Sequence, residues 1–152
     1  MRRLTLIALI AIGLIAFLAI SALLARVLSL DGAERAAITT LVQAEARGNA
    51  AAMVALIHGC GQSPGCRQRA AQDAAELRRP GAVKILTLGP SAGFSLGSTV
   101  GTARVAWRVG GALPIVQCVR VRREGNVLTG LRIQLLEISL KIKGSAACPA
   151  RY

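Results

Sequence analysis

The sequence predicts an α+β domain that follows an N-terminal transmembrane helix, and three observations lead to this prediction. The stretch from Leu4 to Ala25 contains no charged side chain, the next part of the chain has helical hydrophobic spacing, and strand-like alternation begins after residue 82. Helices followed by strands along one chain are typical of the α+β class. The chain therefore divides into a transmembrane signal-anchor (1–26), a short tether (27–30) and one domain (31–152).

The apolar stretch is long enough to cross a bilayer. At 1.5 Å per residue a helix from Leu4 to Ala25 covers about 33 Å, and a hydrocarbon core is roughly 30 Å thick. Arg2 and Arg3 precede the stretch, and basic residues next to a span stay on the cytoplasmic side. We therefore expect a single-pass protein of the cell membrane, with the lipid bilayer around residues 4–25, a cytoplasmic N-terminus and an extracytoplasmic domain.

A cleaved secretory signal is the alternative interpretation of the same stretch. Ala19-Ile20-Ser21 fits a small-x-small cleavage site, and cleavage there would leave a secreted soluble domain. The apolar residues that continue past this site to Ala25 favour a retained anchor. Both interpretations export the domain.

Helical signals begin directly after the tether. Asp31 and Glu34 have the spacing of a capping box and predict a helix start, with an apolar stripe after them. Gly48 is a left-handed stop for this helix, and Asn49 is the N-cap of a second one that ends at Gly59.

A third helix is expected from Ser63-Pro64 to Arg79. Its apolar face is thin, so we expect a helix lying on the surface, with Asp73 and Glu76 exposed.

The rest of the domain alternates with a period of two residues. The expected strands are residues 83–88, 94–96, 102–109, 115–122 and a last one from 131 to 143. A hairpin turn is expected at Glu124-Gly125-Asn126. The alternation slips by one residue at Leu135-Leu136 and then resumes, which is what a β-bulge produces, so the last strand should be long and sharply bent.

Helices followed by an antiparallel meander with a bent last strand resemble the NTF2-like (cystatin-like) cone. The resemblance covers about residues 31–143, and its local motif is Ala-Arg-Gly-Asn-Ala-Ala-Ala-Met at 46–53, similar to the family's helix break. It implies helices packed on one face of a curved antiparallel sheet. The Cys60/Cys66 pair and the apolar inward strand positions depart from the enzymatic members.

Four cysteines, an even number, fall on the exported side. Exported domains keep disulfides, so pairing explains Cys60, Cys66, Cys118 and Cys148 best. Three connectivities are possible, and 60–66 with 118–148 is the most economical because a short turn separates the first two. Their spacing misses that of zinc sites, and His58 is the chain's single histidine, so we expect neither a metal nor another cofactor.

The residue types indicate a non-catalytic protein. The inward strand positions are read as Ala, Val, Ile, Leu and Trp107, without the buried acid or base that catalysis in a cone needs. His58 has no partner acid and is interpreted as a helix-terminal residue. Aromatic residues make up 3% of the chain, too few for a nucleic-acid surface, so no nucleic-acid partner is expected.

A cationic sheet face is the one candidate binding site. Of the 19 Lys and Arg residues, three flank the apolar stretch, which leaves 16 beyond it against seven acidic residues. Part of this balance reflects an Arg-, Ala- and Gly-rich composition typical of a GC-rich, bacterial genome, and outward strand positions are normally polar. The candidate residues are Arg104, Arg108, Arg120, Arg122, Arg132, Lys141 and Lys143.

These observations lead to a functional expectation. The chain is expected to be a membrane-anchored binding or assembly module that docks on anionic headgroups, a wall polymer or a membrane-protein partner. The alternative is a cone whose uncharged interior holds a small apolar ligand or lipid.

Overall fold

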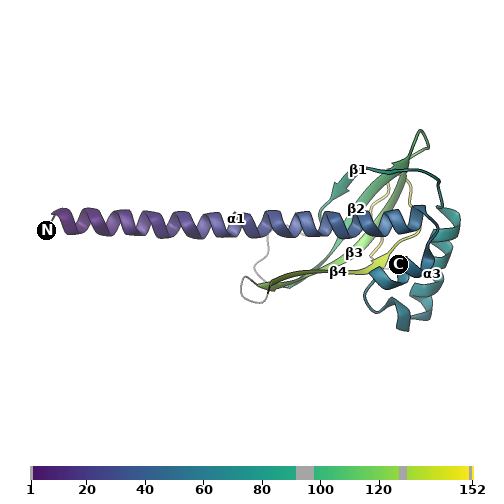
Figure 1. Ribbon diagram of the computed structural model, residues 1–152, viewed down its shortest axis with the longest axis horizontal. Helices are drawn as coiled ribbons and strands as arrows, with labels where there is room; N and C mark the ends of the chain where they lie inside the picture. Colours follow the sequence, from purple (N-terminus) through teal and green to yellow (C-terminus); the bar gives the residue numbers. More distant parts are fainter. Residues whose placement is uncertain (1, 92–97, 127–129, 151) are drawn as a thin grey trace.

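One helix connects the N-terminus to the core of the domain. The computed structural model describes residues 2–91, 98–126, 130–150 and 152. Helix α1 (Arg2–Ala46) is continuous over 45 residues, or about 68 Å, and its first half projects away from the domain (Figure 1). Within the described part of the chain it is the helix long and apolar enough to cross a membrane. Its side chains are exposed as far as Ser29, wherever they are described, and burial begins at Leu30.

The expected tether at 27–30 and the helix start at Asp31 are therefore wrong, because both lie inside α1. The Ser29 hydroxyl donates to the Ala25 carbonyl one turn earlier, within the continuous helix. Asp31 and Glu34 do have capping-box spacing, but their carboxylates bind a side chain from the sheet. The apolar stretch and the domain thus share one continuous helix.

The end of α1 follows the sequence signals. Gly48 has a φ of +73°, and α2 (Ala50–Leu56) begins after Asn49, whose Oδ1 accepts a hydrogen bond from the Ala52 N–H at 2.9 Å. The predicted stop and cap are both confirmed.

The third helix is the one that the Ser63-Pro64 signal predicts. A 3₁₀ turn, η1 (Cys60–Gln62), leads into α3 (Pro64–Glu76), and the Ser63 hydroxyl accepts from the Cys66 N–H at 3.3 Å. The helix ends at Glu76, three residues before the expected Arg79.

Among the described residues, four strands form the sheet: β1 (Val83–Gly89), β2 (Thr99–Val109), β3 (Ile115–Asn126) and β4 (Gly130–Ile138). They pair in chain order as an antiparallel meander, which confirms the predicted α+β class at this level. The expected strand at 94–96 lies outside the described residues. Glu124, Gly125 and Asn126 do not form the expected turn, because they pair with residues 130–132 and extend the ladder.

The predicted bulge in the last strand is confirmed. Arg120 pairs with Glu137 and Val121 with Leu135, so Leu136 is the extra residue. The strand nevertheless ends at Ile138 rather than near 143. The Ser139 hydroxyl accepts from the Cys118 N–H at 2.9 Å, so a side chain takes over part of the ladder, and Ile142 makes only an isolated bridge to Val116.

The two faces of the sheet are covered differently. Residues of α1, α2 and α3 pack with the inward strand residues in one core, whose largest fully buried side chain is Trp107. The opposite face carries the C-terminal residues, which Cys148 joins to Cys118 of β3. The second disulfide links Cys60 to Cys66, so the predicted pairing is confirmed for both.

We expect the Cys118–Cys148 bond to contribute more to stability than the Cys60–Cys66 bond. Its sequence separation is 30 residues against 6, and loop-closure entropy grows with loop length. The double variant Cys118→Ser/Cys148→Ser should lose about 4 kcal/mol of unfolding free energy, and Cys60→Ser/Cys66→Ser about 2 kcal/mol. Denaturant unfolding of the oxidised full chain in detergent measures both, and equal losses would contradict the ranking.

Candidate functional site

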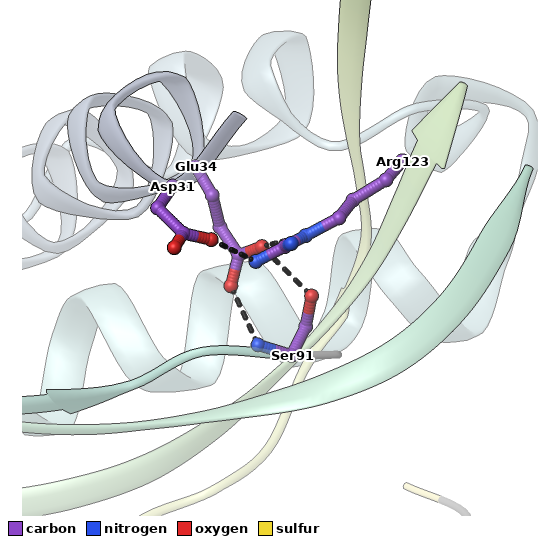
Figure 2. Close-up of polar contacts among 4 residues, drawn as sticks. All are labelled: Asp31, Glu34, Ser91 and Arg123. Carbon is purple, nitrogen blue, oxygen red and sulfur yellow. Dashed lines mark hydrogen bonds and ion pairs between the residues drawn. The ribbon is translucent and has the colours of Figure 1, made fainter. Parts of the chain in front are cut away.

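A buried arginine ties the sheet to α1 where the helix enters the domain. Figure 2 shows Arg123 of β3 between two acids of α1: its Nε lies 2.7 Å from Glu34 Oε2, and its Nη2 lies 2.7 Å from Asp31 Oδ1. Ser91, which follows β1, donates its backbone N–H to Glu34 Oε1 at 2.8 Å and its hydroxyl to Glu34 Oε2 at 2.7 Å. Three segments far apart in sequence thus meet in one polar cluster.

The charges in this cluster compensate one another away from water. The Arg123 side chain is 6% exposed and that of Glu34 is 2% exposed. A buried charge is tolerated where it is paired and its remaining polar atoms are hydrogen-bonded, and Glu34 accepts three such bonds. Charge-assisted bonds of this kind are short and directional. The cluster therefore holds the emerging helix in one orientation relative to the sheet.

The sequence contains a signal for this cluster, although the cluster is not among the predictions above. Arg122 was expected on the outward face of its strand, so alternation places its neighbour Arg123 inward. Asp31 and Glu34, three residues apart, share one side of a helix. An inward arginine together with two acids on one helix face predicts an ion pair between the sheet and the helix.

Two contacts show how α1 lies along β3. Glu34 contacts Arg123, and Glu45 contacts Gln117. Between these two contacts the residue number rises by 11 along the helix and falls by six along the strand. These steps correspond to about 17 Å of helix and about 20 Å of strand, so the two run antiparallel. The end of β3 near Asn126 is therefore the end closest to the apolar half of α1, as Figure 1 also shows.

A pocket of about 170 Å³ lies beside the cluster. Its lining comes from α1, from β1 and the residue after it, and from β3, and it consists of Asp31, Gly32, Glu34, Arg35, Leu88, Pro90 and Arg123. The pocket thus contains carboxylates and guanidinium groups together. A larger pocket, of about 300 Å³, lies elsewhere, between the start of α3, the end of β4 and Tyr152.

The interior of the domain carries a polar group that was not expected. Gln117 is an inward residue of β3 and is fully buried, although the inward positions were read as apolar. Its Oε1 accepts from Trp107 Nε1 at 2.8 Å, and its Nε2 donates to Glu45 Oε1 at 2.6 Å. Trp107 is a core residue as predicted. A single polar residue within an apolar run gives no periodic signal, which is why Gln117 was missed.

Two acids are buried close to this group. Asp73 is fully buried, so its expected exposure on α3 is wrong: a short helix with a thin apolar face still turns one side to the core. Burial raises the pKa of Asp73 from 3.8 to about 7, which Arg69 opposes and Glu76 supports. Burial likewise raises the pKa of Glu45 from 4.5 to about 8, with the Gln117 hydrogen bond opposing and Asp73 supporting the rise. Both Asp73 oxygens and Glu45 Oε2 lack hydrogen-bond partners in the described region.

The seven basic residues of the predicted cationic face do not form one free surface in the structure. Two of its arginines hold the C-terminal residues: Arg104 donates to the Gly144 carbonyl, and Arg120 donates to the Ala150 carbonyl at 3.3 Å and pairs with Glu137 at 3.2 Å. They are therefore occupied within the protein rather than presented to a partner.

The other five basic residues of the predicted face lie at different positions along the length of the sheet and beyond it. Arg122 and Arg132 lie opposite Gln134 and Glu124 in the ladder, at the end of the sheet nearest the apolar half of α1. Arg122 also forms an ion pair with Glu124 at 3.6 Å, and its side chain remains 38% exposed. Arg108 pairs with Lys84 at the opposite end. Lys141 and Lys143 are exposed but lie beyond β4, so their expected strand positions are wrong.

No protein family model, curated protein or solved structure matches this chain. The site is therefore judged on its own chemistry. Across the described ranges, no group of three or more His, Cys, Asp and Glu side chains is placed to hold a metal ion. His58 is exposed at the end of α2, where its backbone N–H donates to the Leu135 carbonyl at 2.7 Å. The features that remain are charged surfaces and a polar pocket near the apolar helix.

Proposed function

We propose that this protein is a single-pass, non-catalytic module that α1 holds at the outer surface of a membrane, where it binds headgroups or a partner. The observation that carries the proposal is the continuity of α1. Its first half exposes apolar side chains that water does not accommodate, and its second half contributes Ile38, Leu41 and Val42 to the core. A single helix that does both supports a domain held directly at the membrane surface.

Topology is the second part of the proposal. Two disulfides agree with an oxidising, extracytoplasmic space, and Arg2 and Arg3 agree with a cytoplasmic N-terminus. A retained anchor is also consistent with the Arg123 cluster. The cluster would orient the domain relative to the membrane only if the N-terminal half of α1 stayed in the bilayer.

An NTF2-like cone is our proposed description of the domain, supported by helices on one face of a bent sheet.

The binding surface that we propose is narrower than the seven-residue face predicted from the sequence. The level of Arg123 corresponds to residues 31–34 of α1, about 9 to 14 Å beyond Ala25. A headgroup layer extends roughly 5–8 Å beyond the hydrocarbon core, and long arginine side chains extend toward it. Arg122 and Arg132, at this level, are the residues we assign to anionic headgroups or to an acidic partner at the membrane surface.

An apolar ligand inside the cone is the less supported alternative. Trp107, Ile38, Leu41 and Met53 are fully buried in the interior, and the buried polar group around Gln117 takes up further space. The two pockets described above are lined partly by exposed residues at the margins of the sheet.

Charge reversal tests the proposed surface. In nanodiscs that contain phosphatidylglycerol, hydrogen exchange of the backbone around Arg122 and Arg132 should be slower than in phosphatidylcholine nanodiscs, and high salt should remove the difference. Arg122→Glu/Arg132→Glu should abolish this protection, whereas Arg108→Glu/Lys84→Glu at the far end should retain it. Protection that is insensitive to lipid charge in the unchanged protein would contradict docking on anionic headgroups.

A further inference from the structure

The face of α1 that packs on the sheet continues toward the N-terminus, beyond the edge of the sheet. Leu24, Leu28, Asp31 and Arg35 recur at intervals of four, three and four residues, so they lie on one side of the helix. Ile38 and Val42 continue the same side and are buried in the domain. Leu24 and Leu28, in contrast, are 60% and 71% exposed. An apolar strip thus leads from the membrane segment to the 170 Å³ pocket at the edge of the sheet.

Gly32 leaves room on this side of the helix. A Cβ atom placed there would meet nothing within 4 Å, although Gly32 lies inside a helix and lines the pocket. Glycine in a helix costs about 1 kcal/mol relative to alanine, and no close contact within the described protein requires it here. The open space beside Gly32 is continuous with the pocket that Asp31 and Arg35 line.

The pocket offers charges of both signs. The Asp31 carboxylate gives Oδ1 to Arg123 and remains 45% exposed, while Arg35 is exposed and has no ion pair within the described part of the chain. An ammonium group donates hydrogen bonds to a carboxylate, and a guanidinium donates to a phosphate. Asp31 lies about 9 Å beyond Ala25 along the helix, at the outer edge of the headgroup layer.

From these observations we infer that the pocket binds the headgroup of a phosphoethanolamine lipid, with its acyl chains along Leu28 and Leu24. The ammonium group contacts Asp31, the phosphate contacts Arg35, and the headgroup occupies the space beside Gly32. A phosphatidylglycerol headgroup has no cation for Asp31, and choline has no N–H to donate. The inference rests on the proposed function, because it requires that α1 spans the membrane.

Lipid retention measured by native mass spectrometry tests the inference. The full chain is reconstituted in nanodiscs with equal parts of phosphatidylethanolamine, phosphatidylglycerol and phosphatidylcholine of identical acyl chains, and then released. Adducts of phosphatidylethanolamine should exceed those of each other lipid by about tenfold, because only its ammonium group donates a charge-assisted hydrogen bond to Asp31. Gly32→Leu, which fills the pocket, should reduce this preference to about twofold or less. Arg35→Gln, at an exposed position, removes the phosphate contact that all three lipids share, so it should lower the total amount of retained lipid.

Gly13→Leu is the matched control. Gly13 is also a helical glycine whose Cβ would meet nothing within 4 Å, but it lies well inside the apolar stretch, so the headgroup preference should persist. Adducts without headgroup preference, a preference for phosphatidylglycerol, or an unchanged preference in Gly32→Leu would overturn the headgroup site alone. Extraction of the unchanged protein from membranes by alkaline carbonate would instead overturn the membrane-spanning function on which the site rests.

Discussion

Replacing Arg123 by methionine is expected to destabilise the domain by about 3–5 kcal/mol. The substitution keeps most of the side-chain volume but leaves Glu34, 2% exposed, without its cationic partner. An uncompensated buried charge is costly because the attraction that offset its desolvation has been removed. Denaturant unfolding of the full chain in a non-ionic detergent, followed by the fluorescence of the chain's single tryptophan, Trp107, measures the loss.

Arg122→Met is the matched control for this experiment. Arg122 is the adjacent residue on the same strand, but it faces outward and pairs with Glu124 at 3.6 Å, with its side chain 38% exposed. Partly exposed pairs contribute only about 0–1 kcal/mol, so this variant should differ little from the unchanged protein.

A double variant separates the loss of packing from the loss of charge balance. Arg123→Met/Glu34→Met removes both charges, so it should recover most of the stability that Arg123→Met loses. If the double variant were as unstable as the single one, the penalty would come from packing rather than from an unpaired charge. Equal effects of Arg123→Met and Arg122→Met would show that the buried cluster does not contribute in the way we describe.

Apart from the Cys118–Cys148 pairing, most features predicted correctly from the sequence are encoded locally. The stop at Gly48 and the cap at Asn49 depend on backbone preferences of a few neighbouring residues. The bulge at Leu135-Leu136 depends on a shift of phase within one strand. Each of these signals lies within about ten residues and does not require knowledge of what packs against it.

The features that were missed depend on partners distant in the chain. Asp31 and Glu34 fit a capping box and a mid-helix ion pair equally well, and only Arg123, about 90 residues away, decides between them. Asp73 is buried because α1 and α3 pack together, which the sparse apolar residues of α3 do not indicate. Arg104 and Arg120 were assigned to an external partner because the return of the chain from Lys143 across the sheet has no periodic signal.

Two buried acids should make the domain more stable in mild acid than in mild base. The pKa of Glu45 is raised to about 8 and that of Asp73 to about 7, chiefly by burial, while in the unfolded chain both ionise near pH 4. Between these limits the folded state binds more protons than the unfolded state, so the unfolding free energy falls as the pH rises. The fall begins near pH 4 and ends near pH 9, above the pKa values of both folded-state acids.

The expected difference between about pH 5 and about pH 8.5 is on the order of 3–5 kcal/mol for the pair. Unfolding curves of the full chain at several pH values, read from Trp107 fluorescence, measure it. Glu45→Gln should flatten the curve and raise stability at the alkaline end, because an amide has no proton to lose and still accepts from Gln117. Adding Asp73→Asn to Glu45→Gln should flatten the curve of stability against pH further. Glu124→Gln, at a partly exposed acid far from Glu45, should leave the slope of this curve unchanged. Stability that rises between pH 5 and pH 8 in the unchanged protein would mean that Glu45 and Asp73 find partners for their charged forms and are not held neutral by burial.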